Sequence, residues 1–150
     1  MSLIGTQVGS YRVTRKLGEG GMGAVYLAEH PLIGKRVAVK VLHGDLAVDP
    51  DVVARFFLEA RAVNDIRHDN IVDILDFART RDEGGADLFY VLMELLEGES
   101  LAARLQRGVP SLPESLHILD QTAAALAASH AHGITHRDLK PDNVVMVPDS

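Results

Sequence analysis

Residues 136–143, with the sequence HRDLKPDN, contain three side chains whose types could carry out chemistry. Asp138 supplies a carboxylate that can act as a general base, and Lys140 places a cation near it. Asn143 offers an amide oxygen, which is a ligand that hard metal ions accept. A polar loop interrupted by proline is the structural alternative, but these residue types in this order favour a catalytic loop.

Glycines near the start of the chain could contact phosphate groups. Gly18, Gly20 and Gly23 have the spacing G-x-G-x-x-G and are followed by Val25. At this spacing backbone N–H groups can approach phosphate oxygens, because no side chains stand in the way. A glycine-rich hairpin turn explains the pattern equally well when the pattern is taken alone.

The same glycines could also belong to a dinucleotide-binding βαβ unit. Asp45 follows Gly23 by about 20 residues, where such a unit carries a ribose-binding acid. A helix should then follow Gly23, yet residues 24–30 (AVYLAEH) stop before Pro31 and are rich in strand formers. The local sequence therefore disfavours this alternative.

Lys40 and Glu59 form a further candidate pair. In VAVK the alternation of a strand puts Ala38 and Lys40 on one face, where the ammonium could meet phosphates beside a flat base. The apolar residues of a predicted helix recur at helical spacing: Val52, Phe56, Val63 and Ile66. Glu59 falls on the same face, where an unpaired carboxylate would be costly, so Lys40 is its predicted partner. An edge position that reaches water is the alternative for Glu59.

These residues need a scaffold, and the first part of the chain predicts a sheet with one helix. Asp49 and Pro50 are typical of a helix start, and the helix is predicted over residues 50–67. Five strand-like runs flank it, at residues 11–17, 24–30, 35–43, 71–78 and 88–95. The pattern thus predicts five antiparallel strands packed with one helix.

The pattern changes near residue 98, which divides the chain into predicted parts 1–97 and 98–150. A long helix is predicted from Ser111 to Gly133, because Ser111 and Glu114 have the spacing of a capping box. Its predicted contact face consists of Leu116, Leu119, Ala123, Leu126 and His130.

Composition narrows the classes of function. The chain has 150 residues, of which 47% are hydrophobic and 24% charged, as in ordinary globular domains. It has no cysteine, so a disulfide framework and a cysteine nucleophile are excluded. The net charge of −6 argues against a nucleic-acid partner. We see no signal peptide or membrane segment, and we expect a cytoplasmic location.

Five features follow one another along the chain: LGEGGMGAV, VAVK, the helix with Glu59, LMELLEGESL and HRDLKPDN. In this order they resemble a eukaryotic-type protein kinase, closest to the bacterial (Hanks-type) serine/threonine kinases. Lys140, two places after Asp138, resembles the serine/threonine class. The resemblance implies a protein-kinase-like α+β fold: a five-stranded antiparallel N-lobe sheet with one helix, αC, followed by the start of a helical C-lobe. It makes the dinucleotide-binding oxidoreductase the less favoured alternative.

The resemblance also implies a role for each matching residue in binding ATP. Glycines would cover the phosphates, and Lys40 would hold the α- and β-phosphates, oriented by Glu59. Met93 matches the gatekeeper, while the Glu94 carbonyl and the Leu96 N–H would bind the adenine edge. The whole nucleotide set is Leu17, Gly18, Gly20, Gly23, Val25, Ala38, Lys40, Glu59, Met93, Glu94 and Leu96, with Leu17, Val25 and Ala38 sandwiching the adenine.

The catalytic loop receives its roles in the same way. Asp138 would accept the proton of a serine or threonine hydroxyl on a protein substrate, and Lys140 would meet the γ-phosphate. Asn143 would bind Mg²⁺. Arg137 matches kinases that are switched on by phosphorylation of an activation loop.

The match ends before the DFG motif, whose aspartate is the main magnesium ligand of the family. We therefore expect the chain alone to be inactive, and a non-catalytic ATP-binding or interaction module is the alternative function. The strand at residues 144–147 is expected to lack its hairpin partner, and the long helix to expose apolar surface. Both features predict self-association of the partial C-lobe.

Overall fold

A computed structural model describes residues 2–135 and 139–148 of the chain. The chain forms two compact units. The first consists of the residues up to Asn64 together with Asp73–Leu95. The second consists of Asp65–Val72 and the described residues from Leu96 onward.

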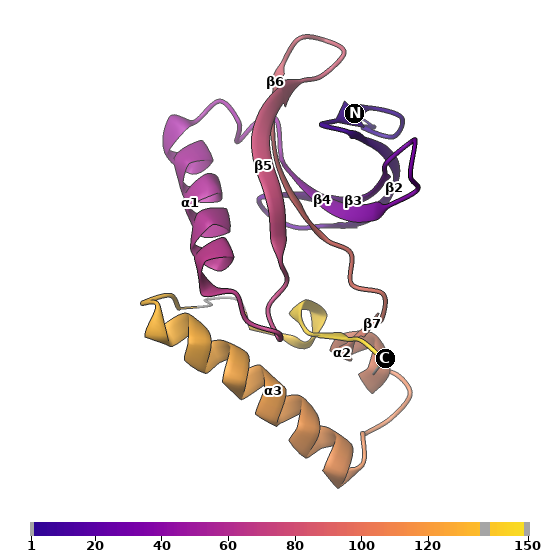
Figure 1. Ribbon diagram of the computed structural model, residues 1–150, viewed down its shortest axis with the longest axis vertical. Coiled ribbons are helices and arrows are strands. Elements are labelled where there is room, and N and C mark those ends of the chain that lie inside the picture. The colour runs from indigo at the N-terminus through magenta and orange to yellow at the C-terminus, as the bar shows by residue number, and fades with distance from the viewer. Residues whose placement is uncertain (1, 136–138, 149–150) are drawn as a thin grey trace. The chain divides into compact units, whose positions relative to one another are not determined.

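The first unit is built on an antiparallel sheet (Figure 1). Its six strands are β1 (Gln7–Val8), β2 (Tyr11–Glu19), β3 (Gly23–Glu29), β4 (Arg36–Leu42), β5 (Ile74–Arg81) and β6 (Asp87–Glu94). They are arranged in the order β1-β2-β3-β4-β6-β5. All five predicted strands are confirmed. The additional strand β1 has only two residues, too few to show the alternation on which a strand prediction depends.

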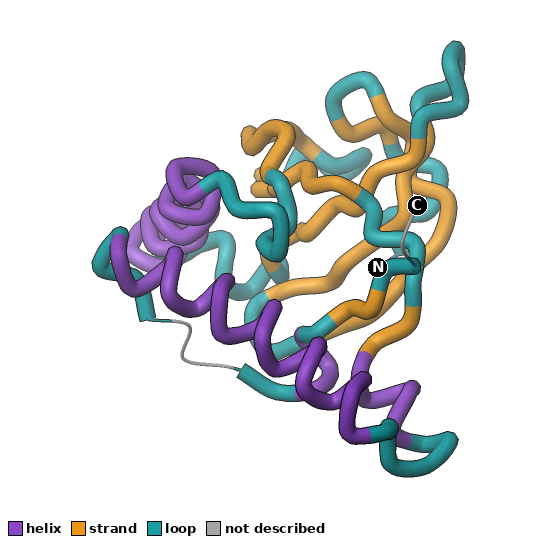
Figure 2. The backbone as a smooth tube through the Cα atoms, turned by 60° about the horizontal axis from the view of Figure 1, so that its bottom comes forward, coloured by secondary structure: helices purple, strands orange, loops and turns teal. Residues whose placement is uncertain are grey.

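Alternating side chains give this sheet two different faces. The strands of the sheet curve (Figure 2), and the face that carries Val37 and Val39 holds the larger core of the unit. Its fully or almost fully buried members are Val8, Val13, Ala28, Val37, Val39, Tyr90 and Leu92. Because β4 is rich in valine, it fits a strand whose two faces are both covered over much of its length.

The other face of the sheet carries helix α1 (Pro50–Ile66), as predicted. Asp49 begins the helix, since its side-chain Oδ1 accepts a hydrogen bond of 2.9 Å from the N–H of Asp51. Phe56 and Ala60, one turn apart, are buried in a cluster with Leu42 and Val91 of the sheet. Burial of the Phe56 ring contributes about 1.5–3 kcal/mol to this packing.

Aromatic rings extend the contact between α1 and the sheet. The ring of Phe57 lies 5.4 Å from that of Phe77 on β5 and 5.8 Å from that of Phe89 on β6, measured between centroids. These separations are within the range at which aromatic pairs attract one another. The edge strand β5 and its neighbour β6 are therefore joined to the helix as well as to each other.

The second unit is mainly helical. It contains β7 (Glu99–Ser100), α2 (Leu101–Leu105), α3 (Leu112–Ala131), the 3₁₀ helix η1 (Pro141–Asn143) and β8 (Val145–Met146). The predicted start of α3 is confirmed, because the Ser111 hydroxyl accepts from the N–H of Glu114. The Glu114 carboxylate does not complete a capping box but pairs with Arg104 of α2 at 3.1 Å. That ion pair joins the two helices.

The strand near the end of the chain has a partner, although this partner is not the hairpin neighbour that our expectation for residues 144–147 concerns. β8 pairs antiparallel with β7, with Glu99 opposite Met146 and Ser100 opposite Val145. Gly98 allows the strands to approach, since a Cβ on Gly98 would overlap the carbonyl oxygen of Met146 and lie 2.8 Å from its carbonyl carbon. The partner is an early segment of the unit and was hidden by distance along the sequence.

The predicted contact face of α3 is wrong for four of its five residues, because only Leu126 is half-buried. Leu116 and Leu119 are 57% and 63% exposed. Most of the other half-buried positions lie on the neighbouring stripe: Ser115, Ile118, Thr122, Ala125 and Ser129. Alanines line much of the helix, so the apolar pattern did not identify which stripe would be covered.

Within residues 2–135 and 139–148, no helix is long and apolar enough to cross a membrane.

Candidate functional site

The glycine-rich turn connects β2 to β3, and its three glycines lie in different surroundings. Among the described residues, a Cβ added at Gly18 would meet nothing within 4 Å, and one at Gly20 would meet only the Gly23 carbonyl oxygen, at 4.0 Å. A Cβ at Gly23 would overlap the carbonyl oxygen of Val41. Gly18 and Gly20 therefore leave open space beside the turn, whereas Gly23 is required by the approach of β3 to β4.

The register of the sheet aligns several predicted nucleotide residues. Val25 on β3 is paired with Lys40 on β4, and Ala38 on β4 is paired with Met93 on β6. Gly18 is paired with Val25 on the other side of β3. Residues directly opposite in an antiparallel sheet share a face, and Ala38 and Lys40 are two apart. All five residues therefore lie on one face of the sheet.

This shared face combines an apolar surface with a cation. Ala38 is buried, while Val25, Lys40 and Met93 are half-buried. Leu17 lies at an irregularity of the β2–β3 pairing and is 41% exposed. Such a face can accept a flat aromatic ring against small and apolar side chains, with an ammonium group available for phosphates.

Glu59 differs from our sequence-based expectation. Its side chain is exposed, and among the described residues no ion pair joins it to Lys40. The packed stripe of α1 contains Phe56 and Ala60, with Val53 and Phe57 beside it, which turns Glu59 towards water. An exposed carboxylate requires no partner, so the edge position that we gave as the alternative is the one observed.

Glu94, at the end of β6, is held in place by Asp73. The Glu94 N–H donates to the Asp73 carbonyl at 3.0 Å, and the Glu94 carboxylate accepts from the Asp73 N–H at 2.9 Å. These contacts use the N–H and the side chain of Glu94, whereas the predicted adenine contact would use its carbonyl. Leu96, the other predicted adenine contact, belongs to the second unit and is half-buried.

The predicted catalytic loop is described in part. Asp138 and Arg137 lie outside the described residues. Lys140 immediately precedes η1, and its carbonyl accepts a hydrogen bond of 2.9 Å from the N–H of Asn143. The Leu101 N–H donates to the Val144 carbonyl at 2.7 Å, which joins the end of η1 to the start of α2. Lys140 and Asn143 are both exposed.

Sequence reasoning missed a polar group around the glycine-rich turn. Glu19 forms an ion pair with Lys16, and a hydrogen bond from Lys16 lowers the pKa of the Glu19 carboxyl. The same bond raises the pKa of Lys16. His43, directly after β4, places Nε2 2.9 Å from the Gly20 carbonyl oxygen. No sequence motif indicates these residues, because only the register of strands β2, β3 and β4 brings them close together.

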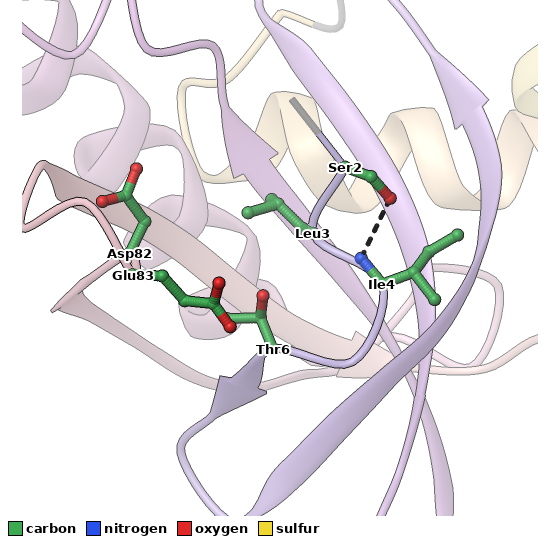
Figure 3. Close-up of a pocket in the computed structure, with 6 residues that line it drawn as sticks. All are labelled: Ser2, Leu3, Ile4, Thr6, Asp82 and Glu83. Carbon is green, nitrogen blue, oxygen red and sulfur yellow. Dashed lines mark hydrogen bonds between the residues drawn. The ribbon is translucent and has the colours of Figure 1, made fainter.

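A pocket in the first unit is lined by other residues (Figure 3). It is formed by the N-terminal segment and the turn between β5 and β6. Its lining residues are Ser2, Leu3, Ile4, Thr6, Asp82 and Glu83. The N–H of Ile4 donates to the Ser2 hydroxyl at 3.4 Å, and Leu3 packs against the larger core. None of the predicted nucleotide residues contributes to this pocket.

Comparison with known proteins relates this arrangement to a family. The protein kinase domain matches residues 11–150. The chain is 51% identical over 146 residues to the serine/threonine-protein kinase Pkn1 of Myxococcus xanthus, covering 97% of this chain and 20% of that protein. It is 40% identical over 144 residues to PknA of Mycobacterium tuberculosis, covering 95% of this chain and 33% of that protein. The chain thus spans a third or less of the length of these two relatives.

Solved structures give the same result. The crystal structure of the Mycobacterium tuberculosis PknI kinase domain matches with a TM-score of 0.75 and 31% identity. The match covers 98% of this chain and 60% of that domain. The dinucleotide-binding alternative is wrong, because a strand rather than a helix follows Gly23. The chain belongs to the protein kinase family, as part of a bacterial serine/threonine kinase catalytic domain of the eukaryotic-like (Hanks) type.

Proposed function

We propose that this chain is the nucleotide-binding part of a kinase that transfers the γ-phosphate of ATP to serine or threonine hydroxyls of a protein substrate. The observation that carries the proposal is the register that puts Gly18, Val25, Ala38, Lys40 and Met93 on one face of the sheet. On this one face, the apolar surface matches the adenine of ATP, and the phosphate-accessible turn and the cation both match its triphosphate.

In the proposed complex, the first unit holds the nucleotide. The adenine lies against Leu17, Val25 and Ala38, with Met93 behind it. The phosphates lie under the backbone of Gly18, Gly20 and Gly23, because the first two leave space there. Lys40 contacts the α- and β-phosphates through its ammonium group. The Glu94 carbonyl and the Leu96 N–H complete recognition by binding the adenine edge.

Glu59 enters this proposal differently from the other residues. Because its side chain is exposed and α1 packs through Phe56 and Ala60, orientation of Lys40 by Glu59 requires α1 to rotate or shift. Family members need this ion pair for transfer. The described conformation is therefore proposed to bind nucleotide without the contact that aligns Lys40.

Transfer depends on the loop of the second unit. Asp138 is proposed to accept the proton of the substrate hydroxyl, and Lys140 to contact the γ-phosphate. Asn143 fits Mg²⁺ as one hard oxygen donor on an exposed turn, and phosphate oxygens and water are the usual remaining ligands. When bound, Mg²⁺ neutralises charge on the phosphates. One amide donor is a weak set, so little or no transfer is proposed for the 150 residues alone.

Partners and location follow from the same chemistry. The exposed leucines of α3 are proposed to support self-association, since contiguous apolar surface favours contact with other protein surfaces. A protein carrying serine or threonine is the proposed substrate. We propose a cytoplasmic location because the phosphate donor is ATP.

The experiment is a calorimetric titration of the chain with Mg²⁺–ATP, followed by mass spectrometry for incorporated phosphate. We expect saturable ATP binding, with little phosphate incorporated. Lack of ATP binding would overturn the proposed nucleotide site. Robust phosphate incorporation that disappears in Asp138→Asn would show that the chain alone transfers phosphate, which contradicts the proposed inactivity and excludes a non-catalytic module.

A further inference from the structure

We infer that His43 is a positioning residue for ATP binding, which holds the glycine-rich turn (residues 18–23) in a shape that can receive phosphates. The inference rests on the nucleotide binding proposed above. His43 lies outside the glycine motif and directly follows β4, the strand that carries Lys40. It therefore connects the turn to the strand whose cation is proposed to contact the same phosphates.

Two contacts from His43 hold both sides of the turn. Its ring nitrogen Nε2 lies 2.9 Å from the carbonyl oxygen of Gly20. Its backbone N–H donates to the carbonyl of Met22 at 2.9 Å. A carbonyl oxygen can only accept a hydrogen bond, so Nε2 must carry the hydrogen in this arrangement. One residue thus binds the turn at two points separated by a single residue, Gly21.

Charged neighbours on β2 favour this orientation of the ring. Oε1 of Glu19 lies 3.8 Å from the same Nε2 of His43, and Oε2 of Glu19 pairs with Lys16. The hydrogen bond from Lys16 lowers the pKa of the Glu19 carboxyl, so Glu19 is ionised at neutral pH. A carboxylate beside Nε2 stabilises the hydrogen on that nitrogen. Glu19 and Lys16 are the charged groups that the described contacts place around the ring.

The turn needs an outside anchor because its own contacts are few. Gly18, Gly20 and Gly21 give the backbone great conformational freedom, and in the part of the chain that the structure describes hardly any atom lies near their Cβ directions. Within the turn, the Gly20 N–H donates to the Gly23 carbonyl at 2.8 Å. Without the His43 ring, ATP would have to order the Gly20 side of the turn as it binds. Ordering on binding lowers affinity, and here it would lower affinity for the phosphates only.

The first experiment compares ATP with adenosine, which lacks the phosphates. His43→Ala should weaken ATP binding by about two- to tenfold, the loss expected for one hydrogen bond, and leave adenosine binding unchanged. His43→Gln should restore ATP binding, because its amide can donate to the Gly20 carbonyl. His30→Ala is the matched control and should change neither affinity, since the His30 ring accepts a local hydrogen bond from the Leu32 N–H just beyond the opposite end of β3.

The second experiment needs no ligand. Hydrogen exchange at the Gly20 amide should be faster in His43→Ala than in wild type, and normal in His43→Gln and His30→Ala. The His43 side chain is 29% exposed, so we expect the variants to fold. If His43→Ala does not fold, His43→Met serves instead, because it keeps bulk without a donor.

The outcomes separate this inference from the proposed function. The positioning role is overturned if His43→Ala leaves the ratio of ATP affinity to adenosine affinity unchanged, whether both affinities stay the same or both fall by the same factor. If wild type binds no ATP, the proposed function fails and the inference about ATP fails with it. In that case exchange at Gly20 still decides whether His43 holds the turn.

Discussion

Gly23 lies so close to Val41 that a Cβ on Gly23 would overlap the Val41 carbonyl oxygen and lie 2.9 Å from its carbonyl carbon. The two residues belong to paired strands, with Gly23 opposite Leu42 and Ala24 opposite Val41. This glycine is therefore required by the sheet itself, independently of any ligand. At Gly18 an added Cβ would meet no atom of residues 2–135 and 139–148 within 4 Å, so the described structure places no such requirement on it.

The first prediction compares Gly23→Ala with Gly18→Ala. Gly23→Ala should lower the free energy of unfolding by about 1–3 kcal/mol, because the strands must separate to admit the methyl group. Gly18→Ala should change it by no more than about 0.5 kcal/mol. Urea unfolding measures both variants. Equal stability of the two would contradict the assignment of different roles to these glycines.

The second prediction concerns the exposed side of α1. Glu59→Gln should change the free energy of unfolding by less than about 0.5 kcal/mol, because the carboxylate is exposed. Phe56→Ala, three positions earlier, should lower it by about 3–5 kcal/mol through loss of a buried ring. Thermal and urea unfolding give both values. A large loss in Glu59→Gln would mean that Glu59 is paired in the folded chain.

The third prediction concerns alkaline pH. Burial raises the pKa of Tyr90 above its ordinary value of 10.0, with a smaller contribution from the charge of Asp76. The unfolded chain then releases this proton at a lower pH than the folded chain, so stability is complete below pH 10 and falls as pH rises above it. Tyr90→Phe should remove that fall. Urea unfolding between pH 9 and 11 measures the onset of this fall, because about one unit on each side of the ordinary pKa covers the pH at which the unfolded chain begins to lose the proton. If wild type and Tyr90→Phe lose the same free energy of unfolding above pH 10, burial of Tyr90 does not raise its pKa.

The fourth prediction concerns self-association. Leu116 and Leu119 are exposed on α3, so replacing both with lysine should shift the chain towards monomer in sedimentation velocity. Leu32, exposed in the connection between β3 and β4, provides the matched control: Leu32→Lys should leave association unchanged. A wild-type chain that stays monomeric at high concentration would contradict this role of α3.

Much of the first unit could be predicted from local sequence. Turn residues separate runs of strand formers between residues 11 and 43, and these runs became β2, β3 and β4. Asp49 and Pro50 correctly indicated the start of α1, and Ser111 that of α3. The shared face of Ala38 and Lys40 followed from strand alternation alone.

Features that depend on distant contacts could not be predicted in this way. The rotation of α1 that exposes Glu59 is set by packing of Phe56 and Ala60 against Leu42 and Val91. The pairing of β8 with β7 joins segments far apart in sequence, as does the contact between His43 and Gly20. Periodicity identifies an apolar stripe, but tertiary packing decides which edge of that stripe is covered.

The most direct test of the central claim is the affinity of the chain for Mg²⁺–ATP with and without the Lys40 ammonium group. Lys40→Met should weaken binding by about 10- to 100-fold, the loss expected for a hydrogen bond to a charged group. Lys35→Met is the matched control, because Lys35 is an exposed lysine in the connection before β4 and should bind ATP like wild type. Weaker ATP binding in Lys40→Met, with normal binding in Lys35→Met, supports the proposed nucleotide site. Equal ATP affinity in Lys40→Met and wild type would contradict it.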